Sequence, residues 1–147
     1  MLDLWQQVRL EAMGTRHALS LAAYEYTFNQ LAPTGSAVRP RWLAEIEPDP
    51  LNPEYLHSNP PLYYVIPGRQ IPRSTHTINV VVPGISNFRK RFGGAEFLLY
   101  SVGGDGANNV AIEVQNTVED VPGADYLIWP PLLSLVREDL MNLGQLQ

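Results

Sequence analysis

The segment GGDGANN at residues 103–109 contains the residue types that hold phosphate groups or calcium ions. A phosphate-binding loop also needs a lysine and a following helix, and a dinucleotide-binding fingerprint needs a helix after its glycines. Here there is no lysine, and an alternating apolar stretch follows. Asp105, Asn108 and Asn109 offer oxygen ligands for calcium, but one carboxylate and two amides form a weak site. Because glycine and asparagine tolerate positive φ, we predict a hairpin turn without a bound metal.

A second segment, FRKRF at residues 88–92, places three cations between two phenylalanines. Arg89, Lys90 and Arg91 can pair with phosphates while aromatic rings stack on bases, which is how single-stranded nucleic acid is held. The chain as a whole has a formal net charge of −5, so nucleic acid is the least favoured partner. We expect a solvated loop between residues 82 and 96, and contact with an acidic protein is the second interpretation.

The groups that perform catalysis or bind metals do not form a recognisable constellation. His17, His57 and His76 lie far apart in the sequence and lack metal-ligand spacing, and no serine has a G-x-S-x-G setting. Outward-facing acids on strands are the ordinary solvent face of a sheet, which is how we interpret Glu45, Glu47, Glu96 and Glu113. We therefore predict that the protein is not an enzyme and holds no cofactor and no metal.

The aromatic side chains are the remaining candidates for recognition, because tyrosine and tryptophan are enriched at protein interfaces. We expect most of them in the core or beside prolines, and some of them at an interface. The residues concerned are Tyr24, Tyr26, Trp42, Tyr55, Tyr63, Tyr64 and Trp129.

The composition is that of one globular domain spanning residues 1–147. With 45% hydrophobic residues, a chain of 147 residues can bury a sizeable core. The absence of cysteine excludes a disulfide scaffold and thiolate chemistry. The first residues lack the basic and apolar regions of a secretion signal, and no apolar run approaches the roughly 18 residues of a membrane span. We expect a protein of the cytoplasm or of a virus particle, with no membrane partner.

Residues 1–32 are predicted to form an N-terminal helical or extended arm. Asp3 is a favourable helix N-cap, and the residues after it have helical spacing. Leu4, Val8 and Ala12 share one face of that helix.

Gly14 interrupts this helical pattern, and the sequence that follows it has two interpretations. Residues 17–30 contain apolar positions that suit a continued helix. The alternation of Tyr24, Tyr26 and Phe28 with polar residues is instead typical of a half-buried strand. We favour a helix followed by a strand.

Residues 33–61 are dense in proline, which excludes a continuous helix. We expect ordered loops there, with a short strand at residues 41–47.

Residues 62–118 are predicted to form the β core. Four stretches rich in β-branched and aromatic residues are separated by turn residues, and they lie at residues 62–66, 75–82, 96–102 and 110–115. Because the connections are too short for helical crossovers, a parallel sheet is disfavoured. The fold class we expect is mainly β: an antiparallel sandwich or barrel with an N-terminal helix and a C-terminal helix.

Residues 126–147 form a C-terminal segment with a helical pattern. Pro130 and Pro131 suit the first positions of a helix, and Gly144 suits its end. We expect this helix to attach the domain to a neighbouring subunit through one apolar face, which consists of Leu132, Leu133, Val136, Leu140 and Leu143.

These observations favour a structural or interaction subunit of a homo-oligomer or of a larger assembly. Among assemblies we expect a virion component, for instance a phage head-decoration or tail protein. The alternative is a small β-fold enzyme or a module that binds carbohydrate or another ligand. The residues we expect to contact a partner are Arg89, Lys90, Arg91, Trp129, Leu132, Val136, Leu140 and Leu143.

Overall fold

The structure is a computed structural model, and it describes residues 4–52, 58, 60–69, 75–82, 86–102, 113–115 and 125–144. The turn predicted at residues 103–109 lies outside these residues, as do His57 and Tyr55. Within these described residues, one long helix comes first, then six strands, then a short helix.

The first helix, α1 (Leu4–Phe28), continues for 25 residues. The prediction of a helix followed by a strand over residues 17–30 is therefore wrong. Gly14 does not interrupt the helix either. A Cβ atom added to Gly14 would lie only 2.7 Å from Cγ2 of Ile128, so glycine is needed there because the helix approaches the sheet closely. The buried face of α1 consists of Leu10, Met13, Gly14, His17, Ala18, Ser20 and Leu21.

Six strands in the described part of the chain form one mixed sheet. They are β1 (Tyr63–Val65), β2 (Thr75–Val82), β3 (Ser86–Gly93), β4 (Leu98–Ser101), β5 (Glu113–Gln115) and β6 (Asp125–Trp129). The order across the sheet is β1-β4-β6-β5-β2-β3. Two antiparallel groups, β1-β4-β6 and β2-β3, are joined by β5, which pairs in parallel with β6 and with β2.

The predicted antiparallel sandwich or barrel is therefore wrong, and the fold is mixed α/β. In the described residues the outermost strands, β1 and β3, do not pair with each other, so the sheet is open. The prediction assumed that neighbouring stretches of sequence pair with each other, and it missed two strands. β3 contains the FRKRF segment, and β6 is a continuous buried apolar run in the interior of the sheet, which has no alternating pattern.

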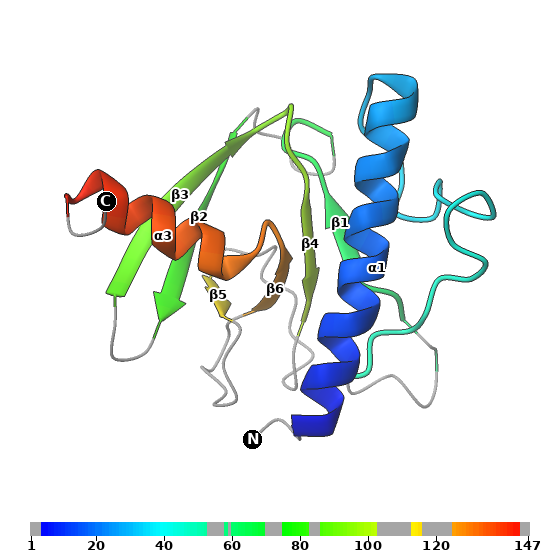
Figure 1. The fold of residues 1–147 in the computed structure, drawn as a ribbon, viewed down its shortest axis with the longest axis horizontal. Helices are drawn as coiled ribbons and strands as arrows, with labels where there is room; N and C mark the ends of the chain where they lie inside the picture. The colour runs from blue at the N-terminus through cyan, green and yellow to red at the C-terminus, as the bar shows by residue number, and fades with distance from the viewer. Residues whose placement is uncertain are drawn as a thin grey trace.

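The two helices cover different parts of the sheet. Figure 1 shows α1 along the β1–β4 side and α3 (Leu132–Asn142) across the β2–β3 side. The alternation of side chains in β6 separates two hydrophobic cores: Tyr126 and Ile128 belong to the core that contacts α1, and Leu127 belongs to the core that contacts α3.

The helix α3 starts at Leu132 with Pro131 as its N-cap, so Pro130 and Pro131 precede the helix and do not occupy its first positions as predicted. Gly144 lies just beyond its C-cap with a φ of +71°, so the end of the helix agrees with the prediction. Its predicted apolar face is partly wrong. Leu132 and Leu135 are buried against the sheet, whereas Leu133 is 79% exposed. Consecutive residues lie about 100° apart around a helix, so Leu132 and Leu133 do not face the same surface.

The proline-rich region begins with an ordered set of turns at residues 31–52. The short strand predicted at residues 41–47 is wrong, since these residues form turns and bends. Trp42 holds them against the end of α1, because its ring lies 5.8 Å from that of Tyr24 and 6.1 Å from that of Phe28.

Candidate functional site: an apolar face of the first helix

The outer face of α1 is apolar along almost the whole helix. The residues on this face are spaced alternately by three and four positions, and the spacing averages 3.5 residues. A helix with this spacing presents a seam suited to a second helix. We call this face the outer stripe, and it consists of Trp5, Val8, Ala12, Thr15, Leu19, Ala22 and Tyr26.

The outer stripe lies mostly opposite the buried face of α1, and its large side chains are exposed to solvent. Trp5 is 70% exposed, Leu19 is 61% exposed and Tyr26 is 92% exposed. Together with Leu4 and Val8, they expose about 600 Å² if a side chain of this kind has roughly 150–200 Å². Scattered apolar residues are normal on a protein surface, and about 600 Å² is at the upper end of the largest apolar patch on a typical monomer, which is often functional. This face is therefore the candidate site.

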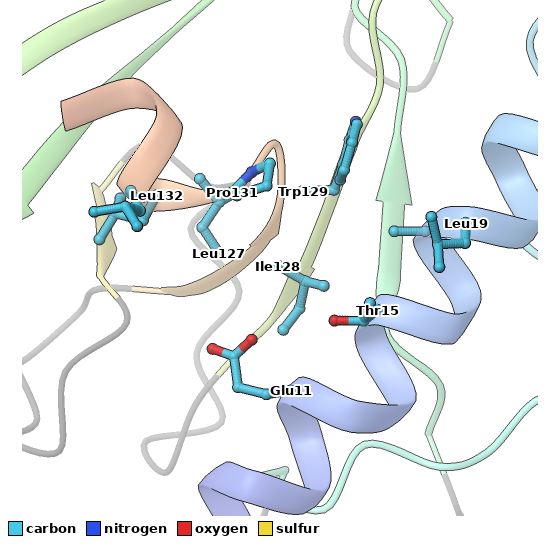
Figure 2. Close-up of a pocket in the computed structure, with 10 residues that line it drawn as sticks. Glu11, Thr15, Leu19, Leu127, Ile128, Trp129, Pro131 and Leu132 are labelled. Carbon is cyan, nitrogen blue, oxygen red and sulfur yellow. The ribbon is translucent and has the colours of Figure 1, made fainter. Parts of the chain in front are cut away.

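A pocket of about 250 Å³ adjoins the outer stripe between α1, the end of β6 and the start of α3. Figure 2 shows Thr15 and Leu19 on the α1 side of this pocket, with Ile128 and Trp129 on β6 and Pro131 before α3. In the described residues, β5 pairs with β6 only at Asp125 and Tyr126, before this part of β6. The pocket therefore extends the apolar surface from α1 towards α3.

A tyrosine of β6 fixes one flank of the outer stripe. The hydroxyl of Tyr126 donates to Oε1 of Glu11 at 2.7 Å and accepts a hydrogen bond from Nε2 of Gln7 at 3.0 Å. Burial raises the pKa of Tyr126, and the neighbouring Glu11 carboxylate acts in the same direction. The tyrosine therefore remains a donor, and the Glu11 side chain is held beside the stripe.

A second pocket, of about 310 Å³, lies beside His17 and Tyr64. Nε2 of His17 donates to the carbonyl oxygen of Gly35 at 2.6 Å, and the hydroxyl of Tyr64 donates to that of Ala32 at 2.8 Å. Burial lowers the pKa of His17 and raises that of Tyr64 to about 12. Both side chains hold the turn after α1 in place, which is a structural role.

Asp49 is a buried acid that the sequence analysis did not single out. Its Oδ1 accepts a hydrogen bond from the backbone N–H of Leu51 at 3.0 Å. Burial raises the pKa of Asp49, while hydrogen bonds from Ser101 and from backbone groups act in the opposite direction. Perturbed acids mark functional sites in many proteins, but Asp49 is enclosed and joins the proline-rich turns to the end of β4.

The basic segment does not form the expected solvated loop, because residues 88–92 lie within β3. Successive side chains of a strand point to opposite faces, so the three cations are divided. Nζ of Lys90 lies 2.7 Å from Oε1 of Glu138 in α3. Arg89 and Arg91 are exposed and alternate with Lys90 along the strand. The sequence run of three cations is therefore not one continuous basic patch.

The candidate contact residues near the C-terminus are largely covered by their own domain. Leu143 is exposed. The ring of Trp129 stacks on that of Phe97 with centroids 6.0 Å apart. The buried or half-buried members of the set are Trp129, Leu132, Val136 and Leu140. Contact with a neighbour through the exposed part of α3 stays a prediction.

Other candidate groups are dispersed in the fold. Arg16 forms an ion pair with Glu47 at 3.0 Å, and a side-chain oxygen of Glu96 accepts a hydrogen bond from the backbone N–H of Gly93. Within the described ranges, no three histidine, aspartate or glutamate residues are grouped so that they could hold a metal ion. The same ranges contain no helix with the length and apolar character needed to cross a bilayer.

Comparison with protein-family models, with curated proteins and with solved structures gave no match. The class of this protein is defined by its own fold and surface. It is a mixed α/β domain that exposes the outer stripe along its longest described helix.

The sequence contained the signal for this seam. As predicted, one face of the helix contains Leu4, Val8 and Ala12. In the structure this face points towards solvent. The remaining stripe was missed because Gly14 was expected to interrupt the helix, so the three-four spacing was not followed to Leu19 and Tyr26.

Proposed function

We propose that this protein is an interaction subunit of a protein assembly and that the outer stripe of α1 is its contact surface. One observation carries the proposal. The helix already buries one apolar face in its own domain, and a second row of large apolar side chains remains exposed on the other side.

The size of this surface supports a specific contact. At roughly 25 cal/mol per Å², about 600 Å² of apolar surface supplies a driving force of about 15 kcal/mol before the costs of association. A standard protein interface buries about 800 Å² on each partner. The outer stripe and the adjoining pocket are therefore large enough to form most of one.

The kind of assembly is a separate part of the proposal, and its support is the composition. A small, acidic, cysteine-free domain with 13 prolines fits a component of a virus particle, such as a phage head-decoration or tail protein, located in the virion or in the cytoplasm of the host cell. Density for this chain inside a purified particle would test this part.

The contact surface can be tested by sedimentation velocity from low micromolar to several hundred micromolar protein. We expect the wild type to form species heavier than the 16.4 kDa monomer. Leu19→Glu should return it to the monomer and should melt like the dilute, monomeric wild type, because Leu19 is exposed in the isolated domain. Gln6→Glu, an exposed change outside the outer stripe, is the matched control. A wild type that stays monomeric throughout, like Leu19→Glu, contradicts the proposal.

A further inference from the structure

We infer that the occupant of the outer stripe is a second copy of this chain, whose α1 packs in parallel and in register to form a two-stranded coiled coil. This inference rests on the proposed function and adds the partner, the number of copies and their orientation. It is carried by the charges beside the stripe and by the direction in which the stripe faces.

The charges on the two flanks of the outer stripe have opposite signs. If Trp5, Ala12, Leu19 and Tyr26 occupy the first position of the heptad, the fifth position holds Arg9 and Arg16, and the seventh holds Glu11 and Glu25. These two positions form the salt bridges between the helices of a coiled coil and set their orientation.

A parallel pair makes these charges complementary. The seventh position of one helix then lies beside the fifth position of the next heptad on the other helix. Glu11 of each copy therefore meets Arg16 of the other copy, and the pair occurs twice by symmetry. An antiparallel pair would instead place fifth positions beside each other, so that Arg9 of one copy repels Arg16 of the other.

The existing contacts of these two side chains are compatible with the pair. The hydroxyl of Tyr126 donates a hydrogen bond to Oε1 of Glu11. In the dimer, Arg16 of the other copy would bind the second carboxylate oxygen. The ion pair between Arg16 and Glu47 joins side chains that are 57% and 44% exposed, so it constrains the arginine weakly.

The position of the domain also permits the parallel arrangement. Most of the outer stripe lies on the side of α1 opposite to its buried face, and Thr15, Leu19 and Ala22 also border pockets beside the sheet. Two copies related by a two-fold axis along the seam therefore keep their sheets apart. A helix of 25 residues is about 37 Å long, which is sufficient for three heptads of contact.

The orientation can be measured with single cysteines, because the wild-type chain has none. In the parallel pair Val8 lies beside Val8 of the other copy. We expect Val8→Cys to form a disulfide-linked dimer under mild oxidation, and Gln6→Cys, which is exposed but outside the outer stripe, to form much less. In an antiparallel pair Val8 lies beside Leu19, so a mixture of Val8→Cys and Leu19→Cys would cross-link better than either variant alone.

Exchanging the charges of Glu11 and Arg16 tests whether the partner is a second copy of this chain. The measured quantity is the affinity of the homodimers and of the heterodimer. Glu11→Arg and Arg16→Glu should each weaken the dimer by about 10- to 30-fold, since two attractive pairs become repulsive. An equimolar mixture of the two variants should form a heterodimer of nearly wild-type affinity, because its pairs are again complementary. Circular dichroism confirms that each variant is folded.

The outcomes separate this inference from the proposed function. A dimer that cross-links through Val8→Cys and a heterodimer preferred over both homodimers support the parallel coiled coil. Antiparallel cross-linking, or a trimer or larger species abolished by Leu19→Glu, overturns this inference and leaves the proposed function standing. A wild type that remains monomeric overturns both.

Discussion

Replacing Gly14 by alanine tests how closely α1 packs on the sheet. In an exposed helix this substitution stabilises the folded state by about 1 kcal/mol. At this position the new Cβ would lie 2.7 Å from Cγ2 and 3.0 Å from Cδ1 of Ile128, well inside the usual contact distance of about 3.5–4.0 Å. Ile128 is buried and β-branched, so its side chain cannot easily move away.

The expected size of the effect follows from two opposing terms. A clash of this kind in a packed core costs about 2–3 kcal/mol, and the helix preference of alanine returns about 1 kcal/mol. We therefore expect Gly14→Ala to lower the free energy of unfolding by about 1–2 kcal/mol. In an Ile128→Ala background the clash is absent, so the same substitution should raise the free energy of unfolding by about 1 kcal/mol.

Urea denaturation of the wild type, the two single variants and the double variant measures this change of sign. Ala23→Gly, at a half-exposed position of the same helix, is the control for helix preference and should cost about 1 kcal/mol. The packing argument is refuted if Gly14→Ala stabilises the wild type as much as it stabilises the Ile128→Ala protein.

Two further predictions concern the other contacts of the helices. Burial lowers the pKa of His17 below its usual 6.5, so at slightly acidic pH the unfolded chain binds a proton that the folded chain does not. The free energy of unfolding should therefore fall as the pH drops below about 6.5. Urea titrations at several pH values should show a weaker pH dependence for His17→Gln than for the wild type. Leu135→Ala should lower the free energy of unfolding by about 2–4 kcal/mol, whereas Leu133→Ala should change it by less than about 0.5 kcal/mol; equal effects in thermal melts would show that the orientation of α3 is wrong.

Local signals in the sequence predicted local structure well. The strand β2 (Thr75–Val82) was predicted with its observed bounds, because it is β-branched and bounded by proline. The end of α3 was predicted from Gly144 alone. The arrangement of the strands could not be predicted in this way. The strand β5 pairs in parallel with β2, which lies far back in the chain, and with β6, which follows it closely, and neither pairing leaves a local pattern.

The strand β3 was not predicted because its three adjacent cations suggested a solvated loop, although its residues alternate as in a strand. Phe88, Lys90 and Phe92 alternate with Arg89 and Arg91, which is the period of a strand. A lysine at an inward position is tolerated there because its long aliphatic stem covers apolar surface while its ammonium group reaches Glu138. Three adjacent cations therefore indicated a solvated loop where a half-buried strand exists.

The error at the end of α1 also concealed the last residue of the outer stripe. The alternation of Tyr24, Tyr26 and Phe28 suggested a strand, in which all three rings would share one face. In the helix the rings separate: Tyr24 and Phe28, four positions apart, lie 4.7 Å apart and pack with Trp42, while Tyr26 points away and is 92% exposed. The domain thus explains two of the three aromatic residues, and the third belongs to the outer stripe. In the proposed dimer a second helix would cover its ring.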